Sequence, residues 1–210
     1  MSRTRVLITV CGTGLLVAGA AGWLITTAEP APPPSFGAPQ TTALRGTPPV
    51  PTAAPTSARR GEPVRTLALP AQGLTVPVVA VGVAPDGSMA IPDDVGTAGW
   101  YRFGAAPGSD RGSIVISGHI NDRDQGPGAF AGLNLVNPGD PVTVVTDTGR
   151  TLRYQVVSRQ RFDKADVPLD RVFDRTGPPR LTLVTCGGAF DRGTGNYRDN
   201  IVVTAVPRSP

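Results

Sequence analysis

Three side chains in the sequence have the types that acyl transfer through a thioester requires. Cys186 follows the apolar run LTLVT and precedes two glycines. His119 is the single histidine and ends the run SIVISGH, and Arg198 precedes the apolar run 201–206. A neighbouring cation lowers the pKa of a cysteine and supplies the nucleophilic thiolate. A histidine can be that cation and then protonate a departing amine, while an arginine stabilises the oxyanion of the attacked carbonyl.

Each of these residues also has an ordinary structural interpretation. A single cysteine after a strand is usually a small buried apolar side chain. A single histidine beside a glycine is usually a turn or surface residue, and an arginine that opens a strand is usually solvated. All three, however, stand at the ends of apolar runs that are typical of buried strands. We therefore expect three strand ends to bring Cys186, His119 and Arg198 together at one open groove.

The N-terminal residues predict a membrane anchor. The run Val6–Ile25 carries no charge and is about as long as a helix that crosses the hydrocarbon core. Arg3 and Arg5 precede it and no Lys or Arg follows until Arg45, which places the N-terminus in the cytoplasm and the rest of the chain outside. A cleaved signal peptide is the alternative. We favour a single-pass protein of the cell membrane, with residues 1–27 as its cytoplasmic end and anchor.

A linker and one folded domain are expected to follow. Residues 28–63 are dominated by Pro, Ala, Thr and Ser, which cannot bury enough apolar surface to fold and predict a disordered, partly polyproline linker. In residues 64–210, short apolar runs alternate with turn residues, and helical pieces are expected only near 129–135 and 167–173. This pattern predicts an all-β domain, a barrel or a sandwich. Strands are expected at Val64–Leu69, Leu74–Val83, Met89–Ile91, Ser113–Ser117, Val142–Thr146, Thr151–Arg161, Arg180–Thr185 and Asn200–Val206.

Cysteine usage and charge exclude some classes of function. The chain has two cysteines, but Cys11 lies in the predicted membrane span and cannot pair with Cys186. Cys186 is then a free thiol, which in an exported domain usually has a function. The net charge of +4 comes from scattered arginines without clustered aromatics, which disfavours a nucleic-acid-binding surface. The glycines of 187–195 are not followed by GK[ST] and do not form a phosphate-binding loop.

The order and context of these segments resemble those of the sortases, a family of membrane-anchored cysteine transpeptidases. ISGH at 116–119 precedes LTLVTC at 181–186, which matches the TLxTC motif of that family, and NYRDNIVV follows at 196–203. The resemblance includes GAF and a leucine at 128–133 and spans about 64–206, together with the anchor and linker. The segment CGGAFDRGTGNYRDN resembles the actinobacterial class F group.

The resemblance implies an eight-stranded β-barrel and a role for each candidate residue. Cys186 would be the nucleophile, His119 the general acid and base, and Arg198 the residue that holds the substrate and stabilises the oxyanion. Thr185 and Gly187, on either side of the cysteine, are expected to contact the substrate. The implied reaction cleaves an LPxTG-type sorting signal of an exported protein between Thr and Gly. The acyl group then passes to an amine of a cell-wall precursor or to a pilin lysine.

The loops near the candidate site carry two further expectations. We expect Asn121–Gly128 and residues 187–195 to border the peptide groove and to influence substrate choice. Some sortases bind calcium, but the loop carboxylates of this chain lack the spacing of a compact oxygen-ligand loop. We therefore expect no metal and no cofactor, with calcium as the alternative. The carboxylates are Asp122, Asp124, Asp163, Asp166, Asp170 and Asp174.

Two other functions compete with this interpretation. The first is another cell-wall cysteine hydrolase or an L,D-transpeptidase. Those enzymes usually have an HGC-type motif or place the cysteine before the histidine, whereas here His119 precedes Cys186. The second is a non-catalytic, membrane-tethered β-domain that binds a surface partner, with Cys186 merely packed inside it.

Overall fold

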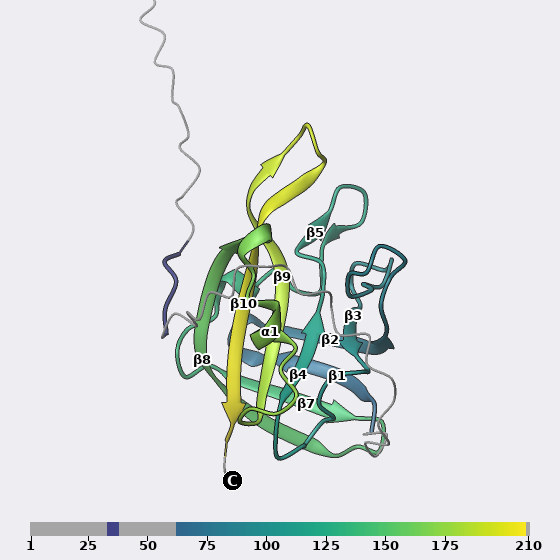
Figure 1. The fold of residues 1–210 in the computed structure, drawn as a ribbon, viewed down its shortest axis with the longest axis vertical. Coiled ribbons are helices and arrows are strands. Elements are labelled where there is room, and N and C mark those ends of the chain that lie inside the picture. The colour runs from purple at the N-terminus through teal and green to yellow at the C-terminus, as the bar shows by residue number, and fades with distance from the viewer. Residues whose placement is uncertain (1–32, 38–61, 209–210) are drawn as a thin grey trace, which may run out of the picture. The chain divides into compact units, whose positions relative to one another are not determined.

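The computed structural model describes residues 33–37 and 62–208 of the chain (Figure 1). The predicted anchor at residues 1–27 lies outside these ranges, as does most of the predicted linker. Within the two described ranges, no helix is both long and apolar enough to cross a membrane.

Eight strands close into a barrel in the order β1-β2-β3-β4-β9-β10-β8-β7 (Figure 1). Neighbouring strands are antiparallel except in the pairs β2–β3 and β4–β9, which are parallel and so need long crossover connections. The barrel strands are β1 (Val64–Leu69), β2 (Leu74–Val81), β3 (Ala98–Tyr101), β4 (Ser113–Ser117), β7 (Pro141–Thr146), β8 (Thr151–Asp163), β9 (Arg180–Asp191) and β10 (Asn196–Pro207). The short elements are η1 (Pro70–Gln72), β5 (Asn121–Asp122), β6 (Gly126–Pro127), η2 (Leu133–Leu135), η3 (Lys164–Asp166) and α1 (Leu169–Val172).

The predicted all-β fold, an eight-stranded barrel with a few short helical pieces, is confirmed, but one strand is different. β3 was not predicted, because its sequence AGWY is short and all four residues are buried, so that it shows no polar alternation. Met89–Ile91 was predicted as a strand and forms only one bridge, between Met89 and Val83. Pro92 follows directly, and proline cannot donate to a strand ladder.

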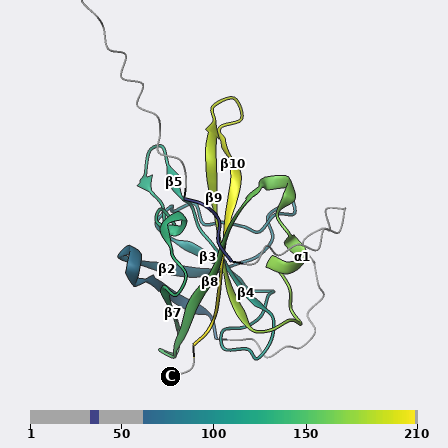
Figure 2. The ribbon, with the colours of Figure 1, turned by 90° about the vertical axis from the view of Figure 1, so that its left-hand side faces the viewer.

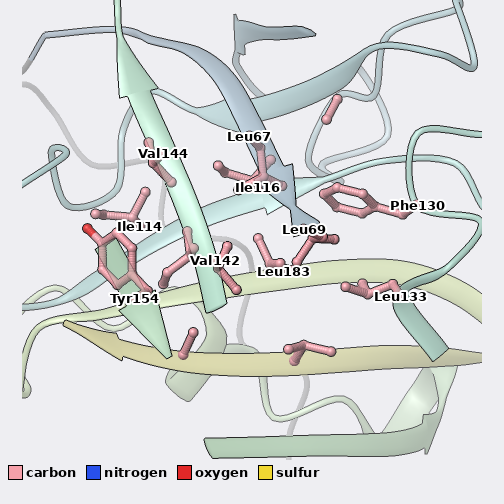
Figure 3. Close-up of a cluster of buried hydrophobic side chains, with 14 of the residues drawn as sticks. Leu67, Leu69, Ile114, Ile116, Phe130, Leu133, Val142, Val144, Tyr154 and Leu183 are labelled. Atoms are coloured by element: carbon pink, nitrogen blue, oxygen red, sulfur yellow. The ribbon is translucent and has the colours of Figure 1, made fainter. Parts of the chain in front are cut away.

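Alternate side chains of each strand fill the interior of the barrel, as the two-residue period of a strand requires. Leu181 and Leu183 of β9 are fully buried in this interior cluster. Figure 3 shows Leu183 in the same interior as Leu67 of β1 and Ile116 of β4. The even-numbered residues of β9 therefore point outward, and Cys186 belongs to this outer face.

A second apolar cluster covers the outside of the strands that lead to the candidate site. Val115 of β4 and Val202 of β10 pack with Val172 and Phe173, at the end of α1. The ring of Tyr101 on β3 meets Phe173 edge-on, with centroids 5.0 Å apart. Figure 2 shows α1 lying outside the barrel. β4 is consequently buried on both faces, which makes it a rigid support for the residues that follow it.

β9 and β10 continue past the candidate residues as a hairpin that projects from one end of the barrel (Figure 1). β9 runs through Cys186 to Asp191, and β10 begins at Asn196, before Arg198. The prediction that Cys186 stands at a strand end and that Arg198 precedes a strand is therefore wrong. Both residues lie within strands, at the base of the hairpin.

The glycines after Cys186 make a bulge instead of ending the strand. The ladder between β9 and β10 shifts its register between Tyr197 and Asp199. Gly188 lies at this shift with a φ of 74°, a left-handed conformation that glycine adopts without steric cost. A bulge bends the strand and increases its twist, so the hairpin tilts while its pairing continues.

Part of the predicted linker is ordered against the barrel. Phe36 pairs with Arg159 of β8 through two backbone hydrogen bonds of 2.9 and 3.1 Å. The Arg159 guanidinium donates to the carbonyl of Pro34 at 2.7 Å and lies 4.9 Å from the centre of the Phe36 ring. β7 pairs with β8 only as far as Gln155, which leaves the later edge of β8 open to this bridge. Composition alone did not predict this contact.

Candidate active site

The register of two parallel strands brings together the segments that carry His119 and Cys186. Ser117 of β4 lies opposite Val184 of β9, and the residues of this ladder keep a constant offset of 67 positions. His119 follows Ser117 by two residues, as Cys186 follows Val184. Residues in register lie on the same face of a sheet. Ser117 and Val184 are the last pair of this ladder, so His119 and Cys186 follow it at matching positions just beyond the end of β4.

Arg198 lies on the other side of the cysteine. Asn200 of β10 pairs with Cys186, and Arg198 comes two residues earlier on the same strand. The two-residue period puts Arg198 on the face of Cys186. Arg198 is exposed and has no partner of its own in the ladder, because the bulge falls at this position. Cys186 thus lies between the histidine and the arginine across three neighbouring strands.

A cavity of about 860 Å³ opens where these strands meet the projecting hairpins. Cys186 and His119 both line this cavity, whereas Arg198 does not. One wall is residues 120–123, and the other comes from residues 190–197 of the β9–β10 hairpin. The segments expected to border a groove therefore do border it. The lining residues are His119, Ile120, Asn121, Asp122, Arg123, Cys186, Phe190, Arg192, Gly195, Asn196 and Tyr197.

Polar and aromatic contacts join and shape the two walls. The side-chain amide of Asn121 donates to the Tyr197 hydroxyl at 2.8 Å, which connects one hairpin to the other. The Tyr197 ring packs edge-on against Phe190, with centroids 5.1 Å apart. These two aromatic residues are paired across the β9–β10 ladder. The wall above Cys186 is therefore aromatic, and more than half of the Phe190 side chain is exposed.

Charge in the cavity comes from both walls. Arg123 and Arg192 lie on opposite sides, and Asp122 is the acidic lining residue. The Asp122 carboxylate accepts hydrogen bonds from the backbone N–H groups of Gln125 and Asp124, which lower the pKa of Asp122, and a smaller contribution comes from His119. Asp122 thus stays negatively charged at this side of the cavity.

The histidine is held by a backbone carbonyl. Nε2 of His119 lies 3.0 Å from the carbonyl oxygen of Pro92, in the connection between β2 and β3. His119 and Cys186 are each half-buried, and Cys186 is a free thiol. A partly accessible cysteine beside an imidazole has the arrangement that thiolate chemistry requires.

Two predicted substrate-binding residues lie elsewhere. The Thr185 hydroxyl is buried and donates to the Gly118 carbonyl at 2.8 Å, a bond that ties β9 to the end of β4. Gly187 is buried, and a Cβ there would collide with Ile201 of the barrel interior. Neither residue lines the cavity.

Sequence reasoning did not single out the residues that form the aromatic wall. Phe190 and Tyr197 flank the turn DRGTGN, and two aromatic residues at such positions favour a cross-strand pair. This signal was present in the sequence, but it becomes visible only once residues 187–197 are recognised as a hairpin.

The described residues contain no group of three or more His, Cys, Asp or Glu side chains close enough to hold a metal ion. Two of the loop carboxylates considered as calcium ligands accept hydrogen bonds from nearby residues. Asp122 accepts them as described above, and Asp174 accepts them from Thr176, Gly177 and Arg180. A second hollow, beneath α1, measures about 10 Å³, which is enough for about one water molecule.

Comparison with known proteins agrees with this geometry. Residues 67–208 match the family model of the sortase domain. Among solved structures, a lid mutant of sortase A from Corynebacterium diphtheriae matches with a TM-score of 0.55 and 21% identity, covering 74% of this chain and 75% of that one. Sortase C2 of pilus island 1 from group B Streptococcus gives 0.52 and 22%, covering 69% and 73%.

Sortase A of Listeria monocytogenes gives a TM-score of 0.52 and 18% identity, covering 71% of this chain and 88% of that one. No curated protein matches the chain. The structural matches show the shared fold, and the family model covers most of the chain. The barrel, with a cysteine and a histidine at one cavity, is thus the domain of the cysteine transpeptidases, and the chain belongs to the sortase family.

Proposed function

We propose that this protein is an active transpeptidase that cleaves an LPxTG-type sorting signal through a thioester on Cys186. The observation that supports the proposal is that His119 and Cys186, which follow the paired strands β4 and β9, both line the 860 Å³ cavity. The acceptor is an amine of a cell-wall precursor or a pilin lysine, and water replaces it in hydrolysis. Nothing in the site favours the competing hydrolase or the non-catalytic binding domain.

The proposed reaction has two halves. The Cys186 thiolate attacks the threonine carbonyl of the signal, and the guanidinium of Arg198 stabilises the resulting oxyanion. The C–N bond breaks as His119 gives its proton to the departing glycine amine. The acceptor amine then attacks the thioester, His119 takes the proton of that amine, and the C–S bond breaks to restore the thiolate. No cofactor is needed at either step.

The proposed setting is the outer side of the cell membrane. Residues 6–25 would form a single span with the barrel outside, as the arginines before the span support. The segment from Cys186 to Asn200 supports assignment to the class F group of the family.

Trapping the thioester tests the proposed function. The full-length chain, with Cys11→Ala to remove the other thiol, is incubated with an LPxTG-type peptide and examined by mass spectrometry. We expect an acyl adduct on Cys186 that a small amine releases, and no adduct in Cys186→Ala. An absence of adduct with every peptide of a sorting-signal library would reject a transpeptidase.

Alkylation of Cys186 near neutral pH provides a second test, which needs no substrate. We expect fast alkylation of the Cys11→Ala chain and at least 10-fold slower alkylation after His119→Ala, because the neighbouring imidazolium stabilises the thiolate. Arg65→Ala, an exposed substitution on β1, is the matched control. Equal rates in all three chains would indicate that Cys186 is only a packing residue.

A further inference from the structure

The contact between His119 and Pro92 determines which ring nitrogen is free for chemistry. A carbonyl oxygen only accepts hydrogen bonds, so Nε2 of His119, 3.0 Å from the Pro92 oxygen, carries a proton. In the neutral ring the other nitrogen, Nδ1, is then unprotonated. Nδ1 is therefore the nitrogen that can take up and release a proton while the Pro92 bond persists.

We propose that Nδ1 of His119 is the atom that exchanges the catalytic proton, and that Gln125 is a positioning residue that holds the Pro92 carbonyl against Nε2. The inference rests on the proposed function for the reaction itself. The assignment of the tautomer rests on the structure alone and can be tested without turnover.

The side chain of Gln125 forms two hydrogen bonds with the segment that follows Pro92. Its side-chain nitrogen donates to the carbonyl of Asp93 at 3.3 Å, and its side-chain oxygen accepts from the backbone N–H of Val95 at 3.4 Å. A third bond, from the Ala129 N–H to the Val95 carbonyl at 2.6 Å, joins the same two segments. The amide of Gln125 thus holds the residue directly after Pro92, while Ala129 fixes the segment two residues further on.

The histidine backbone is fixed to the same part of the chain. The Phe130 N–H donates to the His119 carbonyl at 2.9 Å, and Gly128 packs against that carbonyl so closely that a Cβ would collide with it. Hydrogen bonds from residues 125–130 therefore hold both His119 and the segment that carries Pro92. A loss of the Gln125 bonds frees one partner, Pro92, while the other keeps its position.

The bond to Pro92 can persist through the whole cycle. As imidazolium, the ring donates from Nε2 to Pro92 and gives the Nδ1 proton to the departing amine. As neutral imidazole, it keeps the Nε2 bond and accepts the proton of the incoming amine at Nδ1. The titratable and charged groups that line the cavity with His119 are Asp122, Arg123, Arg192 and the Cys186 thiol, and Asp93 and Asp94 follow Pro92 in the chain.

Nuclear magnetic resonance tests the tautomer directly, because His119 is the single histidine of the chain. The full-length protein, purified in detergent without a histidine tag, is labelled with ¹⁵N-histidine, and long-range ¹H–¹⁵N correlations are recorded above the pH at which the ring titrates. We expect one ring dominated by the Nε2–H form. A ring dominated by Nδ1–H, or an equal mixture of the two forms, would overturn the assignment.

Gln125→Ala tests the positioning role. We expect the Nδ1–H form to grow and kcat for an LPxTG-type peptide with a small amine to fall by about 3- to 10-fold, with KM nearly unchanged, as part of the acid–base contribution is lost. The control is Asp124→Ala, an exposed residue on the same turn that does not line the cavity. Its tautomer and its kcat should match those of the parent chain.

The outcomes separate the two proposals. An unchanged tautomer and kcat in Gln125→Ala would reject Gln125 as a positioning residue, even if the parent chain is fully active. A parent chain without turnover would reject the proposed function, while its spectrum would still decide between Nε2–H and Nδ1–H. If Gln125→Ala fails to fold, Gln125→Glu, which keeps the acceptor for Val95 and loses the donor to Asp93, is measured in its place.

Discussion

At the residue scale, the proposed site consists of Cys186 with His119 on the side of β4 and Arg198 on the side of β10. His119 and Cys186 follow the last pair of the parallel ladder and line one cavity, and Arg198 lies at a bulge two residues from the partner of the cysteine. A bulge re-aims the side chain at its position. The guanidinium is exposed and has no hydrogen-bond or ion-pair partner among the described residues, and in this structure it lies outside the lining of the cavity.

Arg198→Lys separates charge from geometry. Lysine keeps the positive charge but loses the planar fork of donors, so we expect kcat for peptide cleavage to fall by about 10- to 100-fold. Arg65→Lys, on the exposed face of β1, is the matched control and should leave kcat unchanged. Retention of full activity in Arg198→Lys would show that charge alone is sufficient.

A second residue-scale prediction concerns acid stability. Burial by itself would raise the pKa of Asp174, but bonds from the Thr176 and Gly177 N–H groups and from Arg180 lower it to about 2. The folded pKa lies below the unfolded value, so the stabilisation is complete above about pH 4 and is lost as pH falls towards 2.

We therefore expect Asp174→Asn to lower the free energy of unfolding by about 1–2 kcal/mol at pH 7 and to flatten its pH dependence between pH 4 and 2. Urea unfolding followed by fluorescence at several pH values measures both effects. Asp110→Asn, a highly exposed carboxylate, is the control. A parallel loss of stability at every pH would exclude this origin.

At the element scale, two additions to the barrel serve different purposes. The β9–β10 hairpin and residues 120–123 build the walls of the cavity and are joined by the bond between Asn121 and Tyr197. Residues 33–37 form one β-bridge, at Phe36, with the open edge of β8. The first addition shapes the cavity in which the substrate is proposed to bind. The second attaches part of the predicted linker to the domain.

Tyr197→Phe removes the hydroxyl that joins the two walls while it keeps the aromatic contact with Phe190. We expect KM for the peptide to rise by about 2- to 5-fold and kcat to change little, because the groove loses a restraint of about 1 kcal/mol. Tyr154→Phe, a residue of the barrel interior, controls for loss of a hydroxyl elsewhere. A large fall in kcat with an unchanged KM would contradict this role of the hydroxyl.

The segment 33–37 should contribute to stability through its contacts with Arg159. Arg159→Ala removes the side-chain donors to the carbonyls of Pro34 and Val136 and the ring contact with Phe36. We expect a loss of about 1–3 kcal/mol in the free energy of unfolding of the full-length chain. Phe36→Ala should lower it in the same direction. The double variant should then lose less than the sum of the two single losses, since the residues contact each other. Strict additivity would show that the two side chains act separately.

At the scale of the whole molecule, closure of the barrel makes the site depend on the entire domain. β9 carries Cys186 on its outer face and Leu183 in the interior, so the cysteine shares a strand with the core. Leu183→Ala should lower the free energy of unfolding by about 2–5 kcal/mol, the usual cost of a cavity in a core. Val79→Ala, at a half-exposed site on β2, should cost under about 1 kcal/mol. Denaturant unfolding of both variants measures the difference, and equal losses would be inconsistent with a common packed interior.

Local signals in the sequence determined the class of the fold and the chemistry that is proposed. Apolar runs of period two between glycine and proline turns predicted most strands, because that pattern is a local property of a half-buried strand. The types of Cys186, His119 and Arg198 defined the proposed reaction without any structure. The sequence was also sufficient to indicate the sortase family through its motifs.

The tertiary structure alone decided where these residues meet. β3, the hairpin past Cys186 and the bridge at Phe36 depend on pairing with other segments, which no local pattern encodes. The offset of 67 residues between His119 and Cys186 acquires meaning only as the register of two parallel strands. The carbonyl of Pro92 carries no side-chain signal at all, and its place beside His119 follows from the crossover that folds residues 82–97 against the end of β4.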